Sequence, residues 1–221
     1  MPPASPTSNR NRSITFPWND LLELIGECLS SDFSFQMKET LKEIGSAHST
    51  SLCDSAVLYA LVRLSKPKIV LETGTFRGVS TAFILRAQRD AGIENGSVVT
   101  LDRRSDVTIG CAIPEDLKSS VTMLSGNVRE LANDSTVIPP RIDLFYHDST
   151  HRFQYQLWEF HTFWKRLRSG GILASHDVDM NGAFCKFTSG TYCHNGGCTD
   201  WPNTTHTVWG RIFKTGFIRK A

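Results

Sequence analysis

The sequence predicts an α/β protein with a doubly wound, mostly parallel, Rossmann-like sheet that ends in an antiparallel strand. Between residues 68 and 177, short apolar runs alternate with helical periodicities, which is typical of parallel strands joined by crossover helices. Near the end of the chain, an apolar run follows a Gly-rich stretch without a helix long enough for a crossover, so the last strand should run antiparallel. The composition, with 40% hydrophobic and 21% charged residues, is ordinary for a globular protein.

The first 65 residues precede this alternation. Residues 1–15 are rich in Pro, Ser, Asn and Arg, and we expect a disordered tail there. Residues 16–65 are expected to form an N-terminal helical segment. Its helices are predicted at 19–29, at about 35–44 and at 51–64. Asn19 is the expected N-cap of the first helix, and Ser51, followed by Asp54 three residues later, is that of the third.

Residues 66–177 are expected to be the core of the protein. Strands are predicted at 68–74, 96–102, 121–127, 142–148 and 170–177. Helices are predicted at about 78–90 and at 153–168, where aromatic and leucine residues recur at steps of four and three. Right-handed crossovers would place these helices on both faces of the sheet.

Residues 178–221 are expected to complete the same domain with a Cys- and Gly-rich loop and a final strand at 206–215. The stretch from about 180 to 205 has almost no apolar periodicity, so we expect no buried helix in it. Its aromatic residues predict a mobile lid over a substrate; they are Phe184, Phe187, Tyr192 and Trp201. A structural zinc loop stays open as an alternative, with ligands from Cys185, Cys193, His194, Cys198 and His206. A disulfide in the segment around Cys193 and Cys198 stays open as well.

Charge and composition narrow the function classes. The net charge of +2 is too balanced to attract nucleic acid or a membrane surface in bulk. No apolar stretch approaches the roughly 18 residues of a membrane helix, and the N-terminus lacks the apolar region of a secretory signal. Six cysteines in 221 residues are too few for a disulfide scaffold. We therefore expect a cytoplasmic protein with mostly reduced thiols.

Glycines and an acid follow the first two strands, at the edge where open α/β sheets bind ligands. Gly74 and Gly78 allow a sharp turn and a close approach of the backbone to a ligand. Asp102 ends the second strand, where an acid can accept hydrogen bonds from ribose hydroxyls. A tight turn without a ligand and a helix cap are the respective alternatives. Together the two features predict an adenosine-type ligand.

The spacing of the glycines selects among such ligands. Dinucleotide sites prefer Gly-x-Gly-x-x-Gly, whereas here Glu72 precedes Gly74 and three residues separate Gly74 from Gly78. A carboxylate in that position would repel a phosphate. It suits a ligand that ends in a cationic amino-acid group.

These motifs resemble a known family. Residues 70–81, VLETGTFRGVST, are similar to the first motif of class I S-adenosylmethionine-dependent methyltransferases, and Asp102 matches their ribose-binding acid. FYHDSTH and LRSGGILASHD are similar to the paired motifs of the small-molecule O-methyltransferase branch, which often carries a divalent metal. The resemblance covers about residues 51–177. Ser149 and Thr150 depart from the usual Gly and Asp, and Asn127 stands where an acid is common.

The resemblance implies S-adenosylmethionine as the cofactor. Glu72, Gly74 and Gly78 would shape the methionine end, Asp102 would hold the ribose, and Asn127 would lie near the adenine. The full set of expected cofactor-binding residues is Glu72, Gly74, Thr75, Gly78, Ser80, Asp102, Asn127 and Asp148.

Asp148 and Asp177 end the fourth and fifth predicted strands. Neighbouring strands lie roughly 4.8 Å apart, and two carboxylates at that distance repel unless a cation or a proton lies between them. Mg²⁺ or another divalent ion suits these oxygen ligands and would lower the pKa of an acceptor hydroxyl. His176 is a candidate third ligand, which would favour a borderline metal. An N-cap role for Asp148 and a loop hydrogen bond for Asp177 are the alternatives.

His151 is the candidate general base. Together with Asp148 it forms the expected catalytic pair. It follows Asp148 by three residues, at the start of a predicted helix, whose positive end should keep the imidazole neutral. A solvent-facing histidine is the alternative. His147 alternates to the other face of its strand, where a structural role is expected.

The sequence thus predicts an S-adenosylmethionine-dependent O-methyltransferase. Its acceptor would be a hydroxyl of a small molecule, such as a sugar or natural product, with a divalent metal assisting. No nucleic-acid or membrane partner is expected, and a homodimer is an assembly to consider. The alternative is a non-catalytic cofactor-binding module that uses its Cys-rich segment to hold a partner. A protein or RNA methyltransferase would need more basic residues than the sequence offers.

Overall fold

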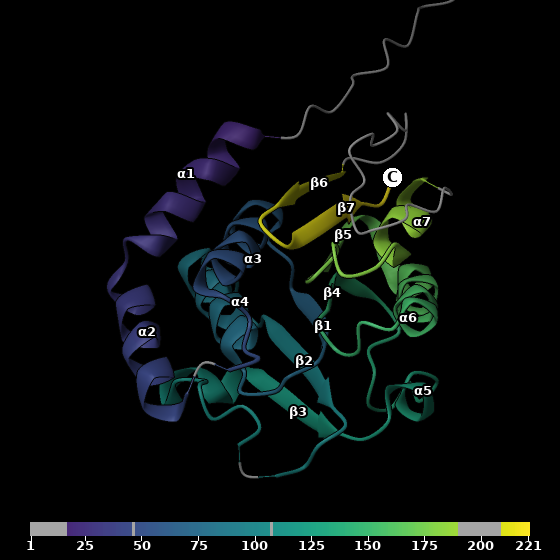
Figure 1. Ribbon diagram of the computed structural model, residues 1–221, viewed down its shortest axis with the longest axis horizontal. Coiled ribbons are helices and arrows are strands. Elements are labelled where there is room, and N and C mark those ends of the chain that lie inside the picture. Colours follow the sequence, from purple (N-terminus) through teal and green to yellow (C-terminus); the bar gives the residue numbers. More distant parts are fainter. Residues whose placement is uncertain (1–16, 46, 107, 190–208) are drawn as a thin grey trace, which may run out of the picture.

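The computed structural model describes residues 17–45, 47–106, 108–189 and 209–221, and these residues form one seven-stranded sheet flanked by helices (Figure 1). The strands are β1 Ile69–Thr73, β2 Ser97–Asp102, β3 Val121–Ser125, β4 Ile142–His147, β5 Leu167–Ser175, β6 Trp209–Ile212 and β7 Thr215–Arg219. Their order is β3-β2-β1-β4-β5-β7-β6. The first five strands are parallel, and β7 runs antiparallel to both β5 and β6. The predicted fold class is confirmed.

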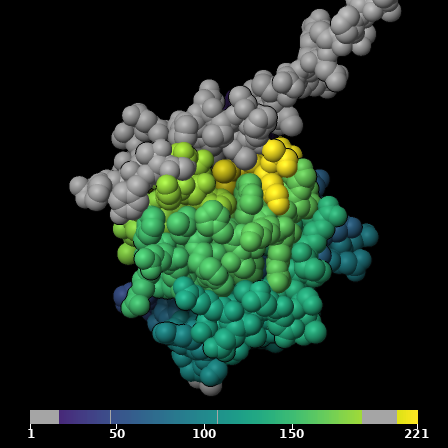
Figure 2. Space-filling view, turned by 90° about the vertical axis from the view of Figure 1, so that its right-hand side faces the viewer, coloured from purple at the N-terminus to yellow at the C-terminus, as the bar shows by residue number. Residues whose placement is uncertain are grey.

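Helices cover both faces of the sheet, as right-handed crossovers require. On one side lie α1 Trp18–Leu29, α2 Asp32–Ile44, α3 Leu52–Ser65 and α4 Val79–Asp90 (Figure 1). On the other lie α5 Val128–Leu131, α6 Phe153–Arg166 and α7 Ala183–Ser189. Figure 2 looks onto this second face, where the green residues of α6 lie at the centre. A 3₁₀ helix, Glu115–Ser120, precedes β3.

Two apolar clusters match the two faces. Val70 and Leu144 point into the cluster under α3 and α4, whereas their neighbours Leu71 and Phe145 point into the cluster under α6. This alternation follows from the two-residue period of a strand. Because both faces are covered, the central strands are apolar on both sides, as their sequence predicted.

The N-terminal segment is helical as expected, with one difference at its start. Ser51 caps α3 by accepting a hydrogen bond from the backbone N–H of Asp54 at 3.0 Å, as predicted. Asn19 is not the N-cap of α1. Pro17 holds that position, and its carbonyl accepts from Leu21 N at 3.0 Å. The N-cap thus lies two residues before the predicted one, and Pro is tolerated at a helix start because the backbone N–H that it lacks would have no partner there.

The prediction of one final strand at 206–215 is wrong. The chain forms a hairpin instead, in which β6 ends at Ile212 and β7 begins at Thr215. Phe213 has a φ of 53° and is half exposed, and an aromatic residue gives no sequence signal for such a turn. The antiparallel direction is confirmed, since β7 pairs antiparallel with β5.

The expectation of no buried helix after residue 180 is also wrong. Residues Ala183–Ser189 form α7, and Phe184 is 1% exposed and packs edge-on against Phe160 of α6 at 5.9 Å. Asn181 opens the helix by accepting from Ala183 N at 2.8 Å. Two aromatic side chains three residues apart, Phe184 and Phe187, therefore suffice to anchor this short helix on α6.

Several expectations concern residues outside those described. They are the tail at 1–15 and the part of the predicted lid or zinc loop that holds Tyr192, Cys193, His194, Cys198, Trp201 and His206. Among the described cysteines, Cys28, Cys53 and Cys111 are free thiols, and Cys185 is disulfide-bonded. In the part of the chain that is described, no helix is long and apolar enough to cross a membrane.

Candidate active site

The register of the parallel strands sets the site. One row across β2, β1, β4 and β5 consists of Leu101, Thr73, His147 and Ser175. The next residue along each strand is Asp102, Gly74, Asp148 and His176. Four polar or glycine positions from four strands are thereby brought to one edge of the sheet, where α/β proteins bind ligands.

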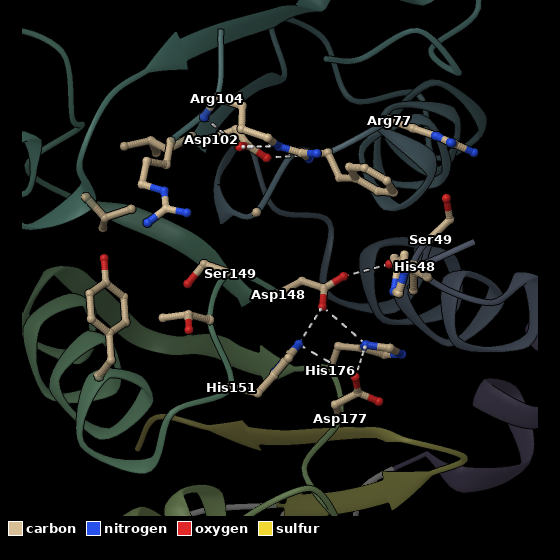
Figure 3. A pocket seen from close by; sticks show the side chains of 18 of the residues that line it. His48, Ser49, Arg77, Asp102, Arg104, Asp148, Ser149, His151, His176 and Asp177 are labelled. Carbon is tan, nitrogen blue, oxygen red and sulfur yellow. Dashed lines mark hydrogen bonds and ion pairs between the residues drawn. The ribbon is translucent and has the colours of Figure 1, made fainter. Parts of the chain in front are cut away.

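A pocket of about 920 Å³ opens at this edge (Figure 3). Its volume lies within the range of small-molecule sites. Seven of the residues predicted for the site line it: Gly74, Asp102, Asn127, Asp148, His151, His176 and Asp177. The other four lie behind its wall: Glu72, Thr75, Gly78 and Ser80.

Gly74 is required by the way β1 meets β4. Its φ is +100°, and a Cβ atom at this position would lie 2.1 Å from the carbonyl oxygen of Asp148. Only glycine allows this backbone to pass so closely. The pocket floor between Asp102 and Asp148 is therefore bare backbone.

Asp102 is fixed by the turns around it. Oδ2 accepts from the backbone N–H of Phe76 at 2.7 Å, and Oδ1 accepts from the backbone N–H of Arg104 at 2.9 Å. Arg104 also places its guanidinium 3.3 Å from Oδ1. The carboxylate is 8% exposed, so it is held in one orientation at the pocket wall.

Glu72 acts behind the wall rather than in the pocket. It is fully buried, and it accepts hydrogen bonds from the hydroxyls of Ser80, Thr81 and Thr100. Thr100 in turn contacts Thr75 at 2.7 Å. Burial, only partly offset by these hydroxyl donors, raises the pKa of Glu72 to about 7. This network ties the turn after β1 to the start of α4 and to β2.

Asn127 and Gly78 have local structural roles. Asn127 is exposed at the pocket rim and caps α5 by accepting from Arg129 N at 3.0 Å. Gly78 is the N-cap of α4 with a φ of +82°, and a Cβ atom there would lie 2.6 Å from Ile113.

Four side chains meet at the deep end of the pocket (Figure 3). Asp148 Oδ1 lies 3.2 Å from His176 Nδ1 and 3.7 Å from His151 Nε2. Asp177 Oδ2 lies 3.5 Å from His176 Nδ1 and 3.6 Å from His151 Nε2. Two carboxylate oxygens thus face two imidazole nitrogens. We call this set of four side chains the His–Asp cluster.

The two histidines of the His–Asp cluster differ in charge. Burial disfavours the charged form of His176, but its contacts with Asp148 and Asp54 outweigh burial and raise its pKa to about 10. Burial lowers the pKa of His151 below its usual value, although Asp148 and Asp177 oppose the shift. At neutral pH, His176 is therefore protonated on both ring nitrogens, and a metal ion that it binds would displace the proton from Nδ1. His151 is neutral.

The His–Asp cluster has the chemistry of a divalent-metal site. Imidazole and carboxylate ligands stand about 2.0–2.2 Å from an ion such as Zn²⁺, so ligand atoms around one ion lie about 3–4 Å apart. The distances of 3.2–3.7 Å fit this. Within the described ranges, Asp148, His151 and His176 form a triad that could hold a metal ion. The expected ligands were Asp148, His176 and Asp177, so His151 is the addition.

Three further residues at this end of the pocket were not predicted from the sequence to belong to the site. Thr50 donates to Asp148 Oδ2 at 2.6 Å, and the ammonium of Lys214 lies 3.3 Å from Asp177 Oδ1. Asp54 lies 3.5 Å from His176 Nε2. The position of Asp54 in a helix-capping motif had indicated only a local role. No sequence pattern linked Asp54 to His176, which lies more than a hundred residues later in the chain.

His147 and Glu159 form a fully buried pair beneath the pocket. His147 Nδ1 lies 2.6 Å from Glu159 Oε2. Glu159 also accepts from Thr73 at 2.7 Å and from Ser149 at 2.9 Å. The pair therefore joins α6 to β1, β4 and the turn that carries Asp148. This placement agrees with the structural role expected for His147.

Comparison with known proteins shows which proteins the chain is similar to. Residues 71–178 match a family model described as a methyltransferase domain. No curated protein matches the sequence.

Solved structures resemble most of the chain. An O-methyltransferase from Bacillus cereus in complex with S-adenosylhomocysteine superposes with a TM-score of 0.62 at 17% identity, covering 90% of this chain and 96% of that one. A methyltransferase from Podospora anserina, also bound to S-adenosylhomocysteine, superposes with a TM-score of 0.59 at 17% identity. The match covers 94% of this chain and 98% of that one. The O-methyltransferase TomG from Streptomyces achromogenes, bound to S-adenosylmethionine, superposes with a TM-score of 0.60 at 14% identity. The match covers 92% of this chain and 96% of that one.

The family match contains the glycine turn, Asp102 and the His–Asp cluster, and the similar structures share the overall fold in which these residues are set. Residues 71–178 are therefore similar to a methyltransferase domain, and the chain has the fold of the solved O-methyltransferases that it resembles.

Proposed function

We propose that this protein is an S-adenosylmethionine-dependent O-methyltransferase that acts on a hydroxyl of a small molecule. The observation that carries the proposal is the shared pocket: Asp102 lies at one side of it and the His–Asp cluster at the other, with the backbone of Gly74 between them. The former can hold an adenosine-type cofactor, and the latter can take a proton from an acceptor. The similar proteins bound to S-adenosylmethionine or S-adenosylhomocysteine support this choice of cofactor.

Asp102 is the proposed ribose ligand. Its carboxylate is held at the pocket wall by Phe76 N on Oδ2 and by the backbone N and Nε of Arg104 on Oδ1. Oδ2 accepts one of these bonds and has a second lone pair with which to accept a ribose hydroxyl. Gly74 offers bare backbone beside it, and Asn127 at the rim lies where the adenine is expected. Glu72, Thr75, Gly78 and Ser80 support the turn from behind, so we assign them an indirect part in cofactor binding.

We assign Asp148, His176 and Asp177 as ligands of a divalent ion. These carboxylate and imidazole donors make the closer contacts within the His–Asp cluster, at 3.2 and 3.5 Å. Such an ion, when bound, would lower the pKa of an acceptor hydroxyl. Two carboxylates and an imidazole suit a borderline ion such as Mn²⁺, Co²⁺ or Zn²⁺ better than Mg²⁺, which prefers oxygen ligands alone.

His151 is the proposed general base. Its side chain is the most exposed of the four in the His–Asp cluster, at 21%, so an acceptor can reach it. Its lowered pKa leaves the imidazole neutral and able to accept a hydroxyl proton. Asp148 and Asp177 face Nε2 at 3.7 and 3.6 Å and would stabilise the imidazolium that forms.

The remaining assignments are part of the same proposal. The enzyme would work in the cytoplasm, without a nucleic-acid or membrane partner, and a homodimer is an assembly to test. A non-catalytic binding module is disfavoured, because such a module has no use for two histidines and two carboxylates converging in its pocket.

Turnover tests the proposal. Purified protein would be supplied with S-adenosylmethionine and a panel of hydroxylated sugars and phenols, each with Mn²⁺, with Mg²⁺ and with chelator, and S-adenosylhomocysteine would be measured. We expect acceptor-dependent turnover that chelator abolishes. Turnover that is unchanged in chelator would contradict the metal, and binding of S-adenosylmethionine without turnover of any acceptor would favour the binding module.

A further inference from the structure

We propose that Asp54 is a positioning residue that holds the imidazole of His176 with Nδ1 toward the metal ligands. The inference rests on the proposed function, since it concerns the ion assigned above. Asp54 belongs to α3, outside the matched residues 71–178. It therefore couples the N-terminal helical segment to the reaction centre.

The two nitrogens of His176 face different carboxylates. Nδ1 points toward the pocket, where Asp148 Oδ1 lies at 3.2 Å and Asp177 Oδ2 at 3.5 Å. Nε2 is buried on the opposite side of the ring, where Asp54 Oδ2 lies at 3.5 Å. Among the described residues, Nε2 has no hydrogen-bond partner, so the ion pair with Asp54 is the polar contact on this side of the ring. Asp54 thus fills the place that a carboxylate takes behind a metal-binding histidine.

Asp54 is itself held rigidly. It is 2% exposed. Oδ1 accepts from the backbone N–H of Lys214 at 2.9 Å and from the Thr215 hydroxyl at 3.0 Å. Oδ2 accepts from the Ser51 hydroxyl at 2.6 Å. The start of α3 and the β6–β7 turn together fix this carboxylate, which in turn restricts the ring of His176.

The contact sets which nitrogen can bind a metal. A neutral imidazole carries its proton on one nitrogen and a lone pair on the other. A carboxylate behind Nε2 stabilises the proton there and leaves the lone pair on Nδ1, which faces the pocket. Without an acceptor behind Nε2, the proton can occupy Nδ1 and block it as a ligand.

The Asp54→Asn substitution tests this because the surroundings dictate its orientation. The backbone N–H of Lys214 must still meet an acceptor, so the amide oxygen takes the place of Oδ1. The NH₂ group then faces Nε2 of His176 and favours a proton on Nδ1. Loss of an outer-shell partner of this kind typically weakens metal affinity 10–100-fold.

The readout is the affinity for Co²⁺ alone, measured by calorimetry and by the visible absorption of the bound ion. We expect Asp54→Asn to bind Co²⁺ 10–100-fold more weakly. Thr215→Val is the matched control, since it removes a bond to the other oxygen of Asp54 and should leave the affinity unchanged. In a His176→Ala background, Asp54→Asn should cause no further loss.

An unchanged Co²⁺ affinity in Asp54→Asn, or an equal loss in Thr215→Val, would overturn the inference. If the wild-type protein does not bind Co²⁺, the metal assignment itself is wrong. If the wild type binds Co²⁺ and Asp54→Asn binds it equally well, only the role of Asp54 is wrong. If Asp54→Asn does not fold, nitrogen NMR of the Zn²⁺-loaded wild type decides: a proton on Nε2 of His176 supports the inference, and a proton on Nδ1 contradicts it.

Discussion

The Oδ1 atom of Asp148 lies 3.2 Å from the Nδ1 atom of His176, although 28 positions separate the two residues in the chain. They meet because β4 and β5 are parallel and paired in register, with His147 opposite Ser175. Each is the first residue after its strand. The contact is therefore a consequence of strand pairing.

Asp148→Asn should weaken binding of Mn²⁺ at least 10-fold and reduce turnover in parallel, because it removes the charge of the carboxylate that faces both histidines. Calorimetry with Mn²⁺ and a turnover assay would measure this. Asp179→Asn is the matched control: Asp179 pairs with Arg211 at 2.9 Å, and its loss should leave Mn²⁺ affinity unchanged. Equal effects of the two substitutions would contradict the assignment.

His151→Gln should lower kcat about 10²–10⁴-fold, the usual contribution of a positioned base. The affinity for Mn²⁺ should change by less than about threefold, because His151 is assigned as base and not as ligand. Steady-state kinetics and metal titration separate these roles. A parallel loss of metal affinity would show that His151 is a ligand, as the triad with Asp148 and His176 would allow.

Glu72 should make the protein less stable as the pH rises from about 4.5 to 7. Its pKa in the folded protein is raised to about 7, so the folded state binds the proton more tightly than the unfolded state. The contribution of Glu72 to the free energy of unfolding is complete below about pH 4.5 and is lost as the pH rises through about 7. At about 1.36 kcal/mol per pKa unit, this contribution is on the order of 3 kcal/mol.

Urea unfolding at pH 5 and pH 8 measures this effect. Glu72→Gln cannot ionise, so its stability relative to the wild type should increase between the two pH values. If both proteins show the same pH dependence, Glu72 does not titrate in this range.

Gly74→Ala should destabilise the protein more than Gly92→Ala does. Both glycines have positive φ, at +100° and +62°, and an alanine there costs about 1–2 kcal/mol in backbone strain. Only at Gly74 would the new Cβ also collide with the Asp148 carbonyl, at 2.1 Å, whereas Gly92 has open space. Urea midpoints provide the comparison, and equal losses would show that the close approach to β4 is not required.

The sequence predicted the parts of the fold that follow from local pattern. Apolar runs placed β1 to β5, because strands buried on both faces are apolar throughout. The strand-end rule then placed Gly74, Asp102, Asp148 and Asp177 at one edge of the sheet.

What the sequence did not predict depends on contacts between distant segments. Asp54 looks like an ordinary helix cap, and only folding brings it to His176 and the β6–β7 turn. The turn at Phe213 and the helix α7 were missed for a related reason. An exposed aromatic in a turn and a short helix fixed by Phe184 against Phe160 are determined by tertiary packing, which overrides local propensity.

The central claim is that the pocket between Gly74, Asp102 and the His–Asp cluster binds S-adenosylmethionine, and calorimetry tests it most directly. The wild-type protein would be titrated with S-adenosylmethionine and, separately, with NAD, and both titrations would be repeated with Asp102→Ala. We predict tighter binding of S-adenosylmethionine than of NAD, and a loss of about 1.5–3 kcal/mol in Asp102→Ala from the missing charged hydrogen bonds. Tighter binding of NAD, or equal binding of S-adenosylmethionine by Asp102→Ala and the wild type, would contradict the account.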